Sequence, residues 1–240
     1  MLYANSEVVS IKGKSIPIVF EDNHLLVVIK PPNIPSQADD SKDDDMLSLL
    51  KLYIKEKYQK PGDVYLGLVH RLDRPAGGLM VFARTSKAAS RLSEAMRNKE
   101  FSKKYFAVVN GVPSIEKNRL VDYLLKDETN NTVKVVNAKV KGAQEAILEY
   151  QMQQSDSHFS LVKINLLTGR PHQIRVQMAN TGYPLYGDQK YGEHQNKTGQ
   201  QLALWSCEIT LEHPVKKEIM TFRSIPDRRE PWSRFQIILK

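Results

Sequence analysis

The sequence predicts an α+β fold with a mainly antiparallel mixed β-sheet flanked by a few helices, and three observations support this class. Short apolar runs of strand length recur along the 240 residues. Most of these runs are joined by polar turns of hairpin length, which favour antiparallel pairing because a parallel pair needs a long crossover. Only a few segments repeat apolar residues at helical spacing, as expected for an α+β chain.

The composition limits the kind of partner. The chain carries 35 Lys and Arg against 27 Asp and Glu, a formal net charge of +8. Such an excess indicates a polyanionic partner, and nucleic acid before a membrane. Cys207 is the only cysteine, which excludes an internal disulfide and favours a reducing, cytoplasmic setting. Neither a run of membrane-spanning length nor a zinc-ligand spacing is present.

The first part of the chain is expected to contain an arm, two strands and a helix. Residues 1–14 show no strong periodicity and are interpreted as a loosely attached arm. Residues 15–240 are predicted to form a single domain, with two subdomains around a cleft as the alternative. Apolar runs at 18–20 and 25–29 predict two strands, and an apolar repeat at helical spacing predicts a helix over 46–58.

A charged loop and a buried strand follow within residues 69–84. The sequence His70-Arg71-Leu72-Asp73 places one carboxylate among basic side chains, and Arg74 adds another. A Pro-Ala-Gly-Gly break precedes an apolar run over 79–83 that predicts a strand. A loop held by a buried strand is a common place for a catalytic group, although a surface turn or a helix cap also explains an aspartate on local grounds.

The rest of the chain alternates strands with two or three helices. A helix is predicted over 87–98, capped by Thr85 or Ser86. Another is predicted over 172–179, with Pro171 as a first helical residue and Gly182 after its end. A short helix is expected within 226–240. Strands are predicted at 106–109, twice within 112–141, and at 146–152, 159–167, 201–211 and 219–222.

Two further segments carry chemistry. Tyr105 stands at the start of a predicted strand, where a phenol can point towards a cleft. The segment Leu167–Val176 places Arg170 and Arg175 on either side of a helix start, with His172 between them. A helix N-terminus beside two guanidinium groups suits a phosphate or a carboxylate. One carboxylate, one phenol and two arginines could form a site if the fold brings them together.

These segments resemble the signature regions of RNA pseudouridine synthases of the RluA type. The resemblance rests on HRLDRPAGGLMVFAR, KKYFAVV and LLTGRPHQIRVQMANTGYPLYGDQKYG, in that order, and extends to VFEDNHLLVVIKPPNIPS and KGAQEAILEYQ. It covers residues 18–222. Ala76-Gly77 stands where the family usually has Thr-Ser, and Gln177 stands where a histidine is frequent. The small N-terminal RNA-binding module of many relatives is expected to be absent.

The resemblance implies the pseudouridine synthase catalytic fold with a central active-site cleft. It implies isomerisation of specific uridines in ribosomal or transfer RNA, without cofactor or metal. Asp73 would be the catalytic aspartate, a nucleophile or charge stabiliser at the sugar. Tyr105 would stack on the base or transfer a proton, and Arg175 would pair with Asp73. Arg170 is the alternative partner or a phosphate contact, and Ile174 would line the pocket.

The target uridine must leave its stack to reach such a pocket. By resemblance, Arg71 holds RNA around the extruded nucleotide, and His70, Arg74, Arg170 and His172 are further expected RNA contacts. Packing of His70 beneath the loop is an equal alternative. Other basic residues are candidates for phosphate contacts, although each alone can be a solvated charge: Lys87, Arg91, Arg97, Lys103 and Lys104.

Two other functions compete with the isomerase. A non-catalytic RNA-binding or ribosome-assembly protein could use the same scaffold. A glycosidase or nucleoside hydrolase shares carboxylate chemistry but needs a second acid or a metal, and the sequence offers no candidate for either. We expect a cytoplasmic monomer that binds RNA and no membrane. Three routes stay open for Asp73: attack on the sugar, attack on the base, or elimination through a glycal.

Overall fold

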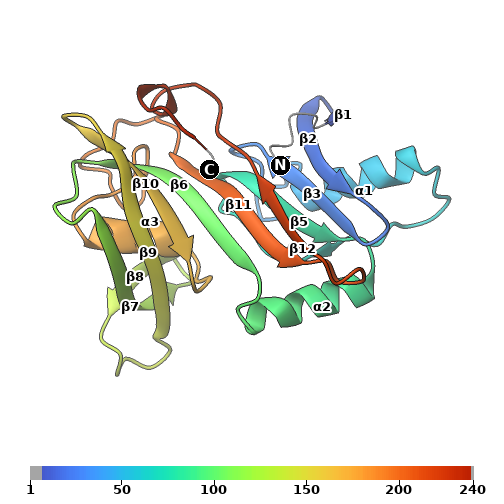
Figure 1. The fold of residues 1–240 in the computed structure, drawn as a ribbon, viewed down its shortest axis with the longest axis horizontal. Coiled ribbons are helices and arrows are strands. Elements are labelled where there is room, and N and C mark those ends of the chain that lie inside the picture. The colour runs from blue at the N-terminus through green and yellow to red at the C-terminus, as the bar shows by residue number, and fades with distance from the viewer. Residues whose placement is uncertain (1–6, 239–240) are drawn as a thin grey trace. The chain divides into compact units, whose positions relative to one another are not determined.

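The computed structural model describes residues 7–238, and it divides them into two compact units (Figure 1). The first unit contains the chain up to Ser102 and the segment Ser206–Ile225. The second unit contains Lys103–Trp205 and Pro226–Ile238. The strand register is antiparallel throughout the recorded pairs within each unit, which confirms an α+β fold with a mainly antiparallel sheet.

The first unit is built on strands in the order β1-β2-β3-β5-β11, with β12 beside β11 and β4 beside β5. Its elements are β1 (Glu7–Ile11), β2 (Lys14–Glu21), β3 (Leu25–Lys30), α1 (Met46–Lys57), β4 (Gly67–Leu68), β5 (Gly77–Ala83), α2 (Ser86–Arg97), β11 (Leu204–Glu212) and β12 (Ile219–Arg223). All seven residues of β5 are buried, so β5 is the centre of this unit's core.

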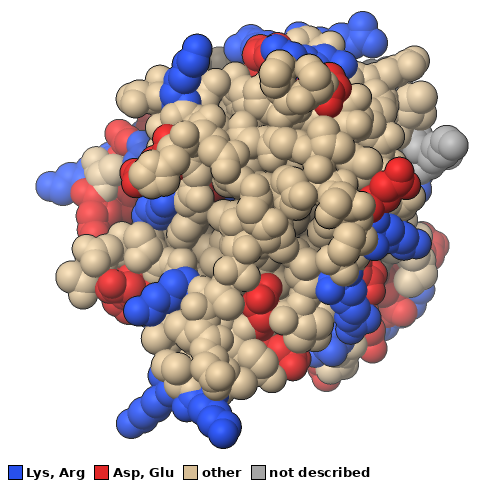
Figure 2. Space-filling view, turned by 90° about the vertical axis from the view of Figure 1, so that its left-hand side faces the viewer, with Lys and Arg blue, Asp and Glu red and all other residues tan. Residues whose placement is uncertain are grey.

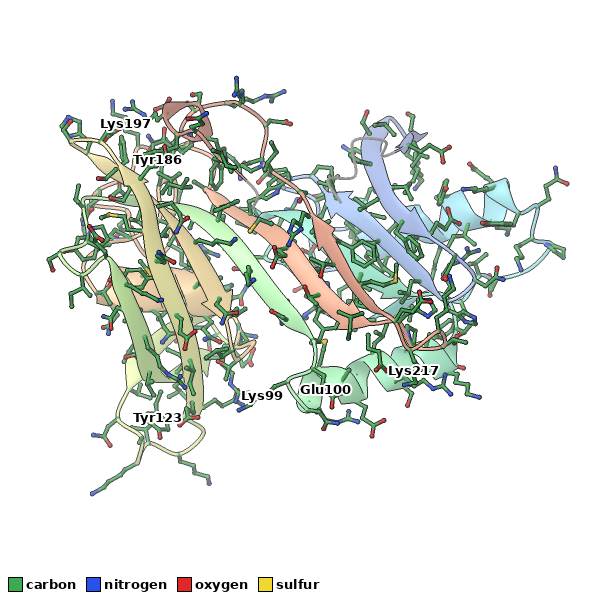
Figure 3. The ribbon with its side chains drawn as sticks, in the orientation of Figure 1. Lys99, Glu100, Tyr123, Tyr186, Lys197 and Lys217 are labelled. Carbon is green, nitrogen blue, oxygen red and sulfur yellow. The ribbon has the colours of Figure 1, made fainter. Side chains whose placement is uncertain are left out.

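Both helices of the first unit begin at the side-chain caps that their sequences supply. Thr85 accepts a hydrogen bond from the Ala88 N–H at the start of α2, and Asp45 does the same for Ser48 in α1. Lys99 and Glu100 follow the C-terminal end of α2 (Figure 3). Helix α2 packs against β4 and β5, and this contact supports the strand that follows the charged loop.

The second unit has the strand order β6-β10-β9-β7-β8. Its elements are β6 (Ser102–Asn110), β7 (Lys117–Asp127), β8 (Thr132–Val136), β9 (Gln144–Ser155), β10 (Phe159–Leu166), α3 (Gln173–Asn180) and the 3₁₀ turn η1 (Trp232–Arg234). Helix α3 packs against β7 and β8 (Figure 1), where Val176 joins a core of Leu124, Val133 and Ala146. This packing fixes the segment that carries Arg170 and Arg175.

The structure differs from the sequence predictions at several places. Residues 7–14, expected as part of an arm, form β1 and its turn into β2; residues 1–6 lie outside the described residues. Lys12 and Gly13 both have positive φ, 46° and 72°, the turn geometry that matches strand twist in a two-residue hairpin. The expected C-terminal helix is only the short turn η1. Helix α3 begins at Gln173, one residue later than predicted.

Charged side chains are distributed unevenly over the face drawn in Figure 2. On this face, Lys and Arg side chains lie mainly around the margin, and the middle consists mostly of uncharged residues.

Among the described residues, no helix is long and apolar enough to cross a bilayer.

Candidate active site

Asp73 lies half-buried in the first unit, on the loop between β4 and β5, and the backbone beside it is held by Ser36. The Ser36 hydroxyl donates to the carbonyl oxygen of Leu72 at 2.7 Å and accepts the Leu72 N–H at 3.1 Å. The N–H of Ala76 donates to the carbonyl oxygen of Asp73 at 3.0 Å and closes a turn. The peptide units around the carboxylate are therefore fixed on both sides.

Lys30 also holds the loop that contains Asp73. Its buried ammonium donates to the carbonyl oxygens of Pro31, Ile34 and Arg74 at 3.0, 2.7 and 2.9 Å. Burial lowers the pKa of Lys30 to about 7, the negative charge of Asp73 acts to raise it, and the charge of Arg74 acts to lower it. The end of β3 is thus tied to the residue after Asp73, within the electrostatic field of that carboxylate.

His70 connects the loop to β5. Its Nε2 accepts the buried N–H of Val81 at 3.0 Å, and its ring lies 5.7 Å from that of Phe101. Because Nε2 accepts a hydrogen bond, this geometry requires the neutral imidazole. His70 is only 6% exposed, so the structure supports the packed alternative for this residue.

The glycine pair at the start of β5 has a steric cause. Gly78 has φ +111°, and a Cβ at this position would lie 2.4 Å from the carbonyl oxygen of Ser206. Only glycine combines that backbone angle with so close an approach. The break predicted from the sequence is therefore the first part of β5, where two backbones of the first unit meet.

The two arginines that flank Asp73 have different surroundings. Arg74 forms ion pairs with Asp43 and, at 3.8 Å, with Asp39. Arg71 is exposed, and within residues 7–238 no hydrogen bond or ion pair involves its guanidinium. Arg71 is therefore better placed than Arg74 for the expected contact with RNA.

In the second unit, Arg175 on α3 is held by Asp188. Its Nε and Nη2 donate to Oδ2 and Oδ1 of Asp188, both at 2.8 Å, and the Asp188 side chain is fully buried. Oδ1 also accepts the N–H groups of Lys190 and Tyr191. The bidentate pair fixes the plane of the guanidinium and neutralises its charge. The expected pairing of Arg175 with Asp73 joins residues of the two units and stays a prediction.

Tyr191 links Arg175 and His172 to β8. Its ring centre lies 5.1 Å from the guanidinium carbon of Arg175, within cation–π range. Its hydroxyl accepts the N–H of Val133 at 2.9 Å and lies 2.6 Å from Nδ1 of His172, to which it can donate. His172 has φ 50° and is the N-cap residue of α3, so these contacts hold an unfavourable backbone conformation.

A chain of amides supports the loop before α3. Thr168 Oγ1 and the Arg170 N–H donate to Oε1 of Gln173, and Nε2 of Gln173 donates to Oε1 of Gln177. Nε2 of Gln177 donates to the carboxylate of Asp122 at 2.8 Å. Gln177, one of the departures from the family pattern, is completely buried and hydrogen-bonded.

The remaining predicted residues also belong to the second unit. Tyr105 lies on β6 and is 4% exposed, and Ile174 is buried on α3. Arg170 donates from Nε to the carbonyl oxygen of Glu145 at 2.9 Å. The structure thus gathers Arg170, His172, Ile174 and Arg175 at the start of one helix. Residues 7–238 contain no group of three or more His, Cys, Asp or Glu that could hold a metal ion.

Four supporting residues were not predicted: Lys30, Ser36, Asp188 and Tyr191. Asp188 and Tyr191 belong to the segment YGDQKYG, which is part of the resemblance, and an acid between two Tyr-Gly turns was a usable signal. Lys30 and Ser36 offered no signal beyond a strand end, because their burial depends on contacts distant in sequence.

Comparison with known proteins identifies the family. Residues 24–180 match the family model described as RNA pseudouridylate synthase. The chain is 31% identical over 208 residues to the uncharacterized RNA pseudouridine synthase YhcT of Bacillus subtilis, covering 85% of this chain and 67% of that protein. It is 31% identical over 217 residues to ribosomal large subunit pseudouridine synthase D of Zymomonas mobilis, covering 86% and 68%.

Solved structures agree with the fold. The human RNA pseudouridylate synthase domain containing 4 superposes with a TM-score of 0.74 over 88% of both chains at 23% identity. The chain spans about two thirds of the length of the curated relatives that it matches. The family model covers more than half of the chain, and the resemblance to RluA-type synthases is confirmed by this match together with relatives named ribosomal large subunit pseudouridine synthases C and D. The chain therefore belongs to the family of RNA pseudouridine synthases.

Proposed function

We propose that this chain converts specific uridines of ribosomal RNA to pseudouridine, with Asp73 as the catalytic carboxylate. The observation that carries the proposal is the immobilised loop around Asp73, which Ser36, Lys30 and His70 hold against β3 and β5. Catalysis requires such preorganisation, whereas RNA binding alone does not. Two of the relatives, named for the ribosomal large subunit, support ribosomal RNA as the substrate; transfer RNA is the alternative.

The reaction breaks the bond between N1 of uracil and C1′ of ribose and joins C5 to C1′. The proton on C5 leaves, and N1 gains one, so no atom is added or lost. An ionised Asp73 would stabilise or attack the electron-poor centre as the first bond breaks. Tyr105 would stack on the detached base, and Arg175 would orient the carboxylate. Extruding the uridine costs about a few kcal/mol when it starts stacked or paired.

Replacement of Asp73 tests this proposal. Asp73→Asn keeps the size of the side chain but removes its charge, and we expect loss of pseudouridine formation with near-normal folding and RNA binding. The measurement is pseudouridine mapping by mass spectrometry on unmodified ribosomal RNA transcripts incubated with each protein. Asp63→Asn, which changes an exposed acid of the same unit, is the control and should retain activity.

The outcomes separate the competing functions. Turnover by Asp73→Asn would exclude the assigned role. Binding of RNA by the wild-type protein without pseudouridine on any RNA of its host would favour the non-catalytic RNA-binding function instead. Activity on free nucleosides alone would indicate a nucleoside hydrolase.

A further inference from the structure

Lys103 is a buried lysine at the start of β6, and no acidic side chain within residues 7–238 forms an ion pair with it. It is 9% exposed, and burial lowers the pKa of its ammonium. In the part of the chain that the structure describes, no ion pair and no hydrogen bond involves that ammonium. Taking a charge out of water without compensation is costly, and such groups are concentrated at functional sites. The sequence alone allowed Lys103 to be a solvated charge, which this burial contradicts.

The position of Lys103 connects it to the candidate site of the second unit. Side chains of a strand alternate between its faces, so Lys103 and Tyr105 share one face of β6, about 7 Å apart along the strand. The ammonium nitrogen lies 3.4 Å from the point where a Cβ on Gly169 would stand. The loop that contains Gly169 is held on both sides, because Thr168 and Arg170 both donate to Gln173.

We propose that Lys103 binds a backbone phosphate of the RNA substrate next to the reacting nucleotide, and that Gly169 leaves room for this phosphate to approach. This inference rests on the proposed function, since the ligand is part of the same RNA. A lysine ammonium is a compact charge that suits a phosphate oxygen. The phosphate would supply the counter-ion that Lys103 lacks in the free protein, so the lysine charge would be neutralised only in the complex with RNA.

The salt dependence of RNA binding tests the contact directly. The probe is a fluorescently labelled oligouridylate, titrated with wild-type protein, Lys103→Met and Lys117→Met at several salt concentrations. Lys117 is an exposed lysine on β7 of the same unit and controls for loss of one charge. For Lys103→Met we expect weaker binding and a slope of log K against log salt that is smaller by about 0.7, the value for one phosphate of a single strand. Lys117→Met should keep most of the wild-type slope.

Thermal unfolding and a second variant separate binding from stability. Removing an uncompensated buried charge should leave the melting temperature unchanged or raise it. Gly169→Ala retains the lysine and adds a methyl group in ordinary contact with its ammonium, at a position without a positive φ. This variant should fold, bind the oligouridylate several-fold more weakly and raise KM more than it lowers kcat. Wild-type affinity and slope in both variants would overturn the proposal.

Pseudouridine formation on unmodified ribosomal RNA transcripts is measured with the same proteins. Normal turnover by the wild type, together with an unchanged salt slope in Lys103→Met, overturns the phosphate contact alone. A reduced slope in Lys103→Met, with no pseudouridine formed by the wild type, supports the phosphate contact and overturns the proposed isomerase. The two hypotheses can therefore fail separately.

Discussion

At the scale of single residues, the orientation of Arg175 depends on Asp188. The two side chains are buried and joined by two hydrogen bonds of 2.8 Å, so each neutralises the other. A buried charge that loses its partner is strongly destabilising. Asp188 therefore has a positioning role even though it need not touch the substrate.

We predict that Asp188→Asn lowers the free energy of unfolding by about 3–5 kcal/mol, because it removes the negative charge from a buried, bidentate ion pair with Arg175. Chemical denaturation measures the change. Arg119→Gln is the control, since it breaks an exposed pair with Glu149 and should cost no more than about 1 kcal/mol. Equal stability of Asp188→Asn and the wild type would show that Arg175 does not depend on this carboxylate.

Lys30 makes stability depend on pH. Its pKa is about 7 in the folded protein against 10.5 as a reference, so above pH 7 the unfolded state binds the extra proton. The contribution of Lys30 to the free energy of unfolding therefore increases as pH rises. Below about pH 7 the side chain is charged in the folded protein, and the full cost of burying that charge applies. Relative to Lys30→Met, the wild type should gain about 1.5 kcal/mol between about pH 7 and pH 8.5.

The measurement is the free energy of unfolding of both proteins across this pH range. Lys55→Met removes an exposed lysine from α1 and controls for the loss of one positive charge. A constant difference between the wild type and Lys30→Met would show that Lys30 keeps its proton throughout. A gain in stability of the wild type relative to Lys30→Met as pH rises would establish the buried amine as the titrating group.

The sequence indicated Asp73 as a candidate but gave no sign of the residues that hold its loop. Asp73 is recognisable because its motif is local, four adjacent residues followed by a glycine break. Lys30 follows an apolar run and precedes two prolines, so local chemistry predicts only the end of a strand. Its ammonium is held by carbonyl groups that lie up to 44 positions away in the chain. The role of Asp188 has no local sequence signal for the same reason, because its partner Arg175 lies on another element.

At the scale of elements, Tyr191 couples the hairpin β7–β8 to the start of α3. The hydroxyl satisfies a backbone N–H of β8 and contacts His172, while the ring covers Arg175. One phenol therefore serves three groups that belong to two elements.

Tyr191→Phe should keep the ring contact with Arg175 and lose the hydroxyl. We expect a loss of about 1–3 kcal/mol, because the Val133 N–H loses its acceptor in a partly buried position. Unfolding by denaturant measures this loss. Tyr123→Phe, on β7 of the same hairpin (Figure 3), removes an exposed hydroxyl 3.5 Å from Glu145 and should change stability by less than about 0.5 kcal/mol. Equal effects of the two variants would contradict the coupling.

Most elements were predictable, and the exceptions have physical reasons. Helices α1 and α2 carry caps and apolar faces that act locally, so both were found within a residue or two. The strand β1 was missed because it is an edge strand with mixed burial, and its turn uses Lys12 where asparagine or aspartate is the usual signal. Pairing with β2 supplies what the local pattern lacks.

At the scale of the whole molecule, the residues implied by the family are divided between two units. Asp73 belongs to the first unit, whereas Tyr105 and Arg175 belong to the second. Each unit orients its own contribution with buried contacts, through Lys30 and Ser36 in one and Asp188 and Tyr191 in the other. The proposed activity therefore depends on both units, and neither contains all of the implied catalytic residues.

The net charge of +8 fits an RNA substrate, but its distribution matters more than its sum. The face drawn in Figure 2 keeps its basic side chains at the margin, so the middle of that face offers little for a phosphate backbone. The two RNA contacts that we propose, through exposed Arg71 and buried Lys103, would differ in kind. Arg71 would bind from a hydrated surface, whereas a phosphate would neutralise the buried charge of Lys103.

The amide chain beside α3 has a direction. Each amide gives its N–H₂ end to the next acceptor, and the series ends on the carboxylate of Asp122, which can only accept when ionised. If the side-chain amide of Gln177 were flipped, its NH₂ group would face the NH₂ group of Gln173. Gln173 would then have to flip as well, and its Oε1 would no longer accept from Thr168 and Arg170. The Asp122 carboxylate and the Ala146 carbonyl both accept from Nε2 of Gln177, so these two acceptors set the direction of every hydrogen bond up to the backbone N–H of Arg170.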